Sequence, residues 1–232
     1  MKAKLILNGI NGKVELYEEV HKYQCSLKNG ILIHSDNQLS ITKIISQFQV
    51  YSFEPANFGM YGAIIKKYHP NERDAWRIFK LATDSMATHL EYRSSRGTEL
   101  HKKAELKQIP YIENLIEELN WDKENVIVAR ELMFYLKTDL FDLPGTIDIV
   151  MINRLTNEVQ LVDFKFSNGN KRDYLDKQLN LYMAILKLAN FKCRGLIGLT
   201  IKDDETITLS KIENKDYDLK SIMTTINYFR KE

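Results

Sequence analysis

Residues 145–166 read GTIDIVMINRLTNEVQLVDFKF. Two runs rich in β-branched and aromatic residues, 146–152 and 159–166, flank a polar segment. Within that segment residues 154–157 have the length of an ordinary hairpin loop. The stretch therefore predicts two antiparallel strands, and the other predicted elements are arranged around them.

The second of these strands carries a charged pair among phenylalanines. Because side chains alternate across a strand, we expect Asp163 and Lys165 on one face, about 6–7 Å apart, and Phe164 and Phe166 on the other. An Asp-x-Lys tripeptide is common by chance, and on its own it is typical of a solvated strand face. A preceding apolar strand with its own aspartate favours a functional site.

Pairing of the two strands adds a second carboxylate. If Asn153 pairs with Glu158, Asp148 lies opposite Asp163. Opposed carboxylates about 5 Å apart repel each other and destabilise a sheet unless a cation lies between them. Carboxylate oxygens suit Mg²⁺ or Mn²⁺, and a neighbouring lysine can orient a water molecule or take its proton. The stretch therefore predicts a centre that cleaves phosphodiesters.

Three motifs in this part of the chain resemble the PD-(D/E)XK nuclease superfamily. They are Gly145-x-x-Asp148, Asp163-Phe164-Lys165 and Gln178-x-x-x-Tyr182. The closest likeness is to the RecB-like branch, which includes phage exonucleases and the mitochondrial genome maintenance exonuclease. The resemblance covers residues 95–200 and implies an α/β (α+β) fold, in which a mixed central β-sheet flanked by helices forms a restriction-endonuclease-like core.

The resemblance also implies a role for each motif residue. Asp148 and Asp163 would bind metal, and Lys165 would be catalytic. Gln178 and Tyr182 are four residues apart on a predicted helix and share one of its faces. In the RecB-like branch such a pair lies beside the active site and positions the lysine or the DNA. A role for Tyr182 in the core alone is the other interpretation.

Two further metal-site candidates lie upstream of the hairpin. Gly97-x-x-x-His101, on a helix predicted for residues 93–106, resembles the RecB-like pattern for a nitrogen ligand. Without that pattern, a single helical histidine indicates a surface or core residue. The resemblance also implies a site role for Glu131, more as a neighbour of the ligands than as a ligand. The resemblance thus implies that His101, Asp148, Asp163 and the Phe164 carbonyl hold one or two Mg²⁺ or Mn²⁺ ions.

Polar and basic side chains outside the motifs are candidates for DNA contact. Ser40-Ile41-Thr42 resembles a Ser-x-Thr at the start of a helix in the phage and mitochondrial relatives, although Ser40 also suits a plain helix cap. The candidate DNA-binding residues are Ser40, Thr42, Arg96, Lys102, Lys171 and Arg172.

Composition limits the class of protein. The 232 residues are 44% hydrophobic, enough to fill one core, and the net charge of +2 says nothing about nucleic acid. The two cysteines, Cys25 and Cys193, cannot form a four-cysteine iron–sulfur cluster and suit a reducing compartment. No apolar run reaches the roughly 20 residues of a membrane span. We expect an intracellular, cytoplasmic protein, with no membrane partner.

The chain is expected to form one domain of three parts. Residues 1–35, with Asn-Gly turns, predict a small antiparallel β-meander as an accessory layer. Residues 36–92 have helical periodicity, and residues 93–232 would be the catalytic core. Helices are predicted near 40–48, 55–93, 111–119, 174–190 and 217–229, and further strands at 126–136, 195–201 and 206–209.

The function expected from these features is that of a Mg²⁺- or Mn²⁺-dependent DNA exonuclease. It would act on single-stranded DNA or DNA ends in replication, recombination or repair. Because a metal site recognises only the phosphodiester, a structure-specific endonuclease or an RNase remains an alternative. A non-catalytic nucleic-acid-binding module is the alternative of a different class.

Overall fold

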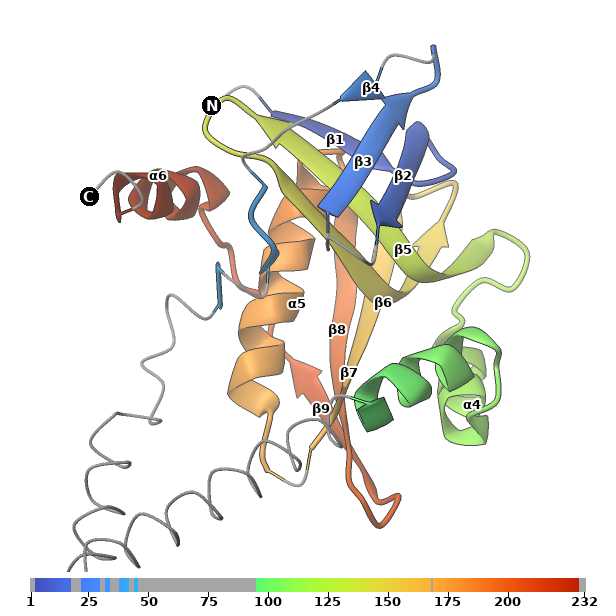
Figure 1. The fold of residues 1–232 in the computed structure, drawn as a ribbon. Helices are drawn as coiled ribbons and strands as arrows, with labels where there is room; N and C mark the ends of the chain where they lie inside the picture. Colours follow the sequence, from blue (N-terminus) through green and yellow to red (C-terminus); the bar gives the residue numbers. More distant parts are fainter. Residues whose placement is uncertain are drawn as a thin grey trace, which may run out of the picture.

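The structure is a computed structural model that describes residues 3–17, 22–29, 32–33, 38–41, 44–45, 95–167 and 169–229 (Figure 1). The helical part predicted for 55–93 and the candidate Thr42 lie outside these residues. Of the helix predicted near 40–48, residues 41, 44 and 45 are helical. No helix in the described ranges has the length and apolar character needed to cross a membrane.

A six-stranded sheet forms the centre of the molecule, with the order β1-β5-β6-β7-β8-β9. Neighbouring strands are antiparallel except β7 and β8, which are parallel. Parallel neighbours need a crossover, and the helix α5 (Arg172–Lys187) supplies it. The strands are β1 (Ala3–Leu7), β5 (Val126–Thr138), β6 (Leu143–Asn153), β7 (Glu158–Phe166), β8 (Lys192–Ile201) and β9 (Ile207–Ile212).

Helices cover both faces of this sheet. On one face α5 packs through Leu179, Met183 and Ile185, and α6 (Leu219–Phe229) adds Leu219 and Met223 to the same core. On the other face lie the helix of residues 95–105 and α4 (Pro110–Leu119), which pack against the second core. A mixed central sheet flanked by helices confirms the predicted α+β fold class (Figure 1).

The N-terminal strands divide between two sheets. β2 (Gly12–Tyr17), β3 (Lys22–Leu27) and β4 (Leu32–Ile33) form a small antiparallel sheet. The predicted meander has strands at residues 4–7, 14–17 and 31–33, and β3 is not among them. β1 instead pairs with β5 as an edge of the large sheet, so the predicted meander of three strands is wrong at its first strand. The physical reason is that β1 is apolar on both faces: Leu5 and Leu7 enter the core under α5, and Ile6 packs with the small sheet.

The hairpin has the predicted loop and register. β6 ends at Asn153 and β7 begins at Glu158. The pairs Ile149↔Val162 and Ile152↔Val159 belong to the register that places Asp148 opposite Asp163. The Asn153 side chain also accepts hydrogen bonds from two loop amides, which closes the turn.

Candidate metal centre

The regular alternation of β5 breaks at Glu131. Before it, Arg130 points to the face with α4 and Ala129 to the face with α5. After it, Leu132 points to the α5 face, although it has the same parity as Arg130. Glu131 has φ 47°, a left-handed conformation that residues other than glycine rarely adopt. The strand therefore turns over at Glu131.

The partner strand β6 shows the same break at the facing position. Ile147 lies in the core under α5, whereas Ile149, two residues later, lies in the core under α4. The register places Asp148, between them, opposite Glu131. Both carboxylates thus occupy the point where two adjacent strands change faces, and a helix from the far side of the sheet can reach them there.

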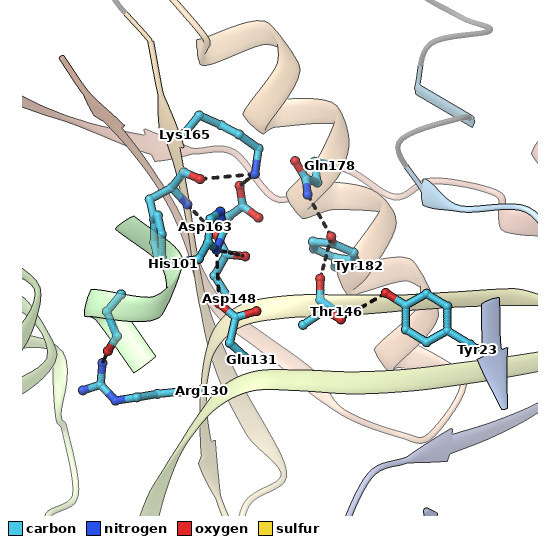
Figure 2. Close-up of polar contacts among 12 residues, drawn as sticks. Tyr23, His101, Arg130, Glu131, Thr146, Asp148, Asp163, Lys165, Gln178 and Tyr182 are labelled. Carbon is cyan, nitrogen blue, oxygen red and sulfur yellow. Dashed lines mark hydrogen bonds and ion pairs between the residues drawn. The ribbon is translucent and has the colours of Figure 1, made fainter. Parts of the chain in front are cut away.

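That helix carries His101. Residues 95–105 are helical, and the chain leaves the helix at Lys107 with φ 58°, shortly before Pro110, as predicted. His101 Nδ1 lies 3.1 Å from Glu131 Oε1 and 3.6 Å from Asp148 Oδ1 (Figure 2). The imidazole also packs against the ring of Phe164, with centroids 4.5 Å apart. One helix and two strands therefore converge on one point.

The backbone of β7 fixes Asp148. Asp148 is 6% exposed, and its Oδ2 accepts a hydrogen bond of 2.9 Å from the backbone N–H of Phe164. Its other oxygen, Oδ1, faces His101. The hydrogen bond to Oδ2 thus fixes the orientation of the carboxylate, and Oδ1 is left to bind a cation.

Asp163 and Lys165 lie on one face of β7, as the strand period predicts. Lys165 Nζ donates to Asp163 Oδ2 over 2.6 Å and to the Phe164 carbonyl over 3.2 Å. Asp163 is completely buried, and its Oδ1 has no hydrogen-bond partner among the described residues. A buried carboxylate oxygen without a partner is costly unless a cation or water binds it.

The pair Gln178 and Tyr182 lies beside this cluster on α5 (Figure 2). Gln178 Nε2 donates to the Tyr182 hydroxyl over 2.8 Å, and that hydroxyl donates to the Thr146 carbonyl over 2.8 Å. The Oε1 atom of Gln178 is buried and has no partner in the described ranges. Tyr23 of the small sheet reaches the same place, with its hydroxyl 3.3 Å from Thr146 Oγ1.

Burial and mutual repulsion shift the acidic groups. Burial raises the pKa of Asp163 to about 7, and the negative charge of Asp148 adds to that rise. Burial likewise raises the pKa of Asp148, against the nearby Lys165 and His101 charges. Burial also raises the pKa of the Tyr182 phenol well above its usual value, so this group is a neutral hydrogen-bond donor. Keeping the carboxylates of Asp148 and Asp163 ionised at this buried position therefore costs free energy.

The basic groups shift upward as well. Burial alone would lower the pKa of His101, but the hydrogen bond to Glu131 and the charge of Asp148 outweigh it, so the pKa is raised. Burial acts in the same way on Lys165, and the charges of Asp163 and Asp148 outweigh it too, so its pKa is raised. Each base is stabilised in its charged form by the acids around it.

The geometry fits a divalent cation. Two ligand atoms about 2.1 Å from an octahedral ion and at right angles to each other are about 3.0 Å apart. His101 Nδ1 lies 3.1 Å from Glu131 Oε1, close to that value, and 3.6 Å from Asp148 Oδ1. The ligand atoms of His101, Glu131 and Asp148 all lie within 4.8 Å of one another. A mixed nitrogen and oxygen set of this kind suits Mn²⁺ as well as Mg²⁺.

The group of side chains that could hold an ion is not identical to the predicted ligand set. Glu131, expected as a neighbour of the ligands, lies in the group that can hold an ion. Asp163 and the Phe164 carbonyl, expected as ligands, both contact Lys165. The predicted residues His101, Asp148, Asp163, Lys165, Gln178 and Tyr182 do lie together (Figure 2).

The predicted DNA-binding residues are spread more widely. Arg96 forms an ion pair with Glu99 on the helix that carries His101, and Lys102 is exposed beside His101 in sequence. Lys171 and Arg172 are exposed at the start of α5. Ser40 is partly buried, and its carbonyl accepts from the N–H of Ile44, as at the start of a helix.

Three residues beside the centre have no signal in the sequence. The Arg130 guanidinium donates to the Ala104 carbonyl over 2.8 Å and to Glu113 over 2.7 Å, so it ties the His101 helix and α4 to β5. Thr146 and Tyr23 link the small sheet to Tyr182. Of the three, only Arg130 could have been singled out from the sequence, because an arginine within an apolar strand needs a partner for its buried charge.

Comparisons with known proteins add little to the geometry. No protein-family model matches the chain, and no curated protein matches it. Among solved structures, the crystal structure of SSO0001 is similar, with a TM-score of 0.43 and 14% sequence identity. The match covers 86% of this chain and 79% of that chain. A likeness at this level carries no argument about function.

Proposed function

We propose that this protein is a Mg²⁺- or Mn²⁺-dependent nuclease that hydrolyses phosphodiester bonds of DNA. The observation that carries the proposal is the convergence of His101, Glu131 and Asp148 on one point, with Asp163 and Lys165 next to it. DNA as the substrate, and the preference for single strands or ends, are proposed from the sequence motifs, which are similar to those of the RecB-like PD-(D/E)XK branch.

The charges of the cluster support a resident cation. Three carboxylates, Glu131, Asp148 and Asp163, face one ammonium and one imidazole. Two of these carboxylates are at most 6% exposed. A buried group with excess negative charge is unfavourable, and a divalent ion at this point would offset the excess.

A divalent ion bound there would activate a water molecule and stabilise charge on the phosphate. The residues of the chain have separate tasks in this proposal. His101, Glu131 and Asp148 hold the ion, and Asp163 keeps Lys165 in place. The Lys165 ammonium, 2.6 Å from Asp163, orients the attacking water and stabilises the charge that develops on the phosphate oxygens.

The proposal includes an intracellular, cytoplasmic location and no iron–sulfur cluster. Cys25 is buried in the core of the small sheet and Cys193 is partly buried on β8, in the region that the structure describes. Two separate thiols suit a reducing compartment, where DNA or RNA substrates are present.

The test is incubation with end-labelled single-stranded and double-stranded linear DNA, circular DNA and RNA, with Mg²⁺, Mn²⁺ or EDTA. The expected result is metal-dependent shortening of linear DNA from its ends. Lys165→Met should reduce cleavage by about 10²–10³-fold, the range for loss of one group that stabilises transition-state charge. Lys192→Met, at an exposed position on β8, is the matched control and should cleave at the wild-type rate.

Each other outcome has a meaning. Cleavage of circular DNA would indicate an endonuclease, and cleavage of RNA alone an RNase. Binding of DNA without cleavage under every metal condition would favour the non-catalytic module and overturn the proposal. Equal cleavage by wild type and Lys165→Met would remove the lysine from the mechanism.

A further inference from the structure

A cavity of about 300 Å³ lies beside the metal centre, on the face of the sheet covered by the His101 helix and α4. This volume is at the small end of the range for ligand sites. Its walls come from that helix, the start of α4, the end of β7 and the β8–β9 turn. The lining residues that matter here are Arg96, Leu100, Lys103, Tyr111, Phe166 and Lys202.

The cavity and the metal centre use neighbouring residues of the same helix and of the same strand, β7. Arg96, Leu100 and Lys103 lie three and four residues apart and so form one face of the helix, about 10 Å long. His101 follows Leu100 and projects from the neighbouring face. Phe166 follows Lys165 on β7 and points to the opposite side of the strand. A chain whose phosphate lies at His101 would therefore have its next residue within reach of the cavity.

The chemistry of the walls is apolar with planar groups. The Arg96 guanidinium carbon lies 5.6 Å from the centre of the Phe166 ring, and Leu100, Ile201 and Ile207 add aliphatic surface. Tyr111 is 41% exposed at the edge of the cavity. Guanidinium planes and aromatic rings are the surfaces on which proteins stack unpaired bases.

The charges of the lining favour an anionic chain. Three basic residues, Arg96, Lys103 and Lys202, stand against Glu99 and Glu205. Glu99 is itself paired with both Arg96 and Lys103, at 2.7 Å and 2.6 Å. The remaining positive charge suits a phosphate backbone that passes over the opening.

We propose that this cavity receives one unpaired nucleobase, from the nucleotide adjacent to the phosphodiester at the metal centre. The proposal rests on the proposed nuclease function and narrows its substrate to nucleic acid that is single-stranded at this position. A paired base stays within its duplex stack and cannot enter a cavity of this size.

The test uses a series of single-stranded oligonucleotides, each with one abasic position. A small chromogenic phosphodiester without a neighbouring base serves as the reference substrate. For the wild type, one abasic position next to the cleaved bond should lower kcat/KM by about 10-fold, through KM, as expected for the loss of one stacked base. Abasic residues farther along the strand should have less than a twofold effect.

Two variants assign this effect to the cavity. Arg96→Lys keeps the charge and removes the planar group, and Tyr111→Ala removes an exposed ring. In both, the ratio of kcat/KM for the intact oligonucleotide to that for the small diester should fall by about 10-fold. In these variants an abasic residue next to the cleaved bond should no longer lower kcat/KM, because the substitution and the abasic residue remove the same contact. Tyr17→Ala, at a ring 50% exposed on β2, is the matched control and should keep the wild-type ratio.

The outcomes separate the two proposals. If neither the oligonucleotide nor the small diester is cleaved, the nuclease function fails, and this inference fails with it. If both are cleaved and no abasic position matters, or if the variants keep the wild-type ratio, the cavity does not bind a base and the nuclease function stands.

Discussion

Glu131 combines a place in the candidate metal centre with an unusual backbone conformation. Its φ of 47° lies in the region that costs a residue with a Cβ about 1–2 kcal/mol relative to glycine. Strain of this kind persists where the surrounding structure enforces it, and it is often found at functional sites. Here the turned-over strand brings a carboxylate to the metal centre.

Replacement of Glu131 separates these two roles. We expect Glu131→Gly to be more stable than Glu131→Ala by about 1 kcal/mol, because glycine accepts the positive φ without strain. Both variants should lose Mn²⁺ affinity to the same extent, since both lack the carboxylate. Urea denaturation measures the first effect, and a Mn²⁺ titration of the melting temperature measures the second.

A control is available in the hairpin loop. Asn157 has φ 56°, far from the metal centre in the hairpin register. Asn157→Gly and Asn157→Ala should show a stability difference of the same sign with unchanged Mn²⁺ affinity. Equal stability of the two Glu131 variants would contradict a strained Glu131.

Gly145 and Gly97, each part of a sequence motif, have different structural reasons. A Cβ on Gly145 would lie 2.7 Å from the buried ring of Phe134, its partner on β5. Gly145→Ala should therefore destabilise the fold by about 1–3 kcal/mol, through overpacking. A Cβ on Gly97 would meet nothing within 4 Å, so Gly97→Ala should stabilise its helix by about 0.5–1 kcal/mol.

Chemical denaturation of the two glycine variants measures both effects. Mn²⁺ affinity should be unchanged in the folded form of either variant, because neither position supplies a ligand. A stabilising Gly145→Ala would show that the Phe134 ring moves freely, which its complete burial does not suggest.

At the scale of elements, the metal centre depends on how the His101 helix is held. Arg130 is 10% exposed and joins the last turn of that helix to α4 through Ala104 and Glu113. Arg130→Met should cost about 1–3 kcal/mol, because it leaves a carbonyl and a partly buried carboxylate without their donor. It should also weaken Mn²⁺ binding, since the helix that places His101 loses its attachment.

The comparison for Arg130 is Arg194→Met. Arg194 is 42% exposed and lies over the Trp121 ring, so its loss should cost less than about 1 kcal/mol and leave Mn²⁺ binding unchanged. Unfolding curves and Mn²⁺ titrations of both variants decide the matter. An Arg130→Met protein with wild-type Mn²⁺ affinity would show that the helix holds its place by packing alone.

The hairpin and its charged pair were predictable because they depend on local rules. Strand alternation placed Asp163 beside Lys165, and loop length set the register that places Asp148. The position of β1 depends on its pairing with β5, more than 100 residues later in the sequence, which no local pattern reveals. The resemblance placed Glu131 near the metal, more as a neighbour of the ligands than as a ligand. Its positive φ, which turns the strand over and brings the carboxylate to His101 and Asp148, follows no local sequence pattern.

For the whole molecule, we expect binding of a divalent ion at the candidate centre to depend on pH. The pKa of Asp163 is about 7 in the fold, above its value of about 3.9 in an unfolded chain. In the metal-free fold Asp163 therefore binds a proton more tightly than in the unfolded chain. The contribution of this proton to the free energy of unfolding is present at low pH and is lost as pH rises through about 7. The raised pKa of His101 acts in the same direction.

Divalent metal should reverse this dependence. Because bound metal favours deprotonated ligands and neighbours, Mn²⁺ should raise the melting temperature more at pH 8 than at pH 6. Below pH 7 the affinity should fall by about tenfold per pH unit for each proton displaced. Asp148→Asn should lose most of the Mn²⁺ shift at both pH values. An identical Mn²⁺ shift at pH 6 and pH 8 in the wild type would contradict the coupling.

The pairing of β1 with β5 also sets an order of events during synthesis. Ala3 leaves the ribosome long before Thr138, its partner in the sheet. Closing so long a loop is entropically slow, and contacts distant in sequence delay folding. β1 therefore waits, with both of its apolar faces uncovered, until the residues of β5 have emerged. Pulse-labelled hydrogen exchange during refolding should find its amides protected after those of the hairpin.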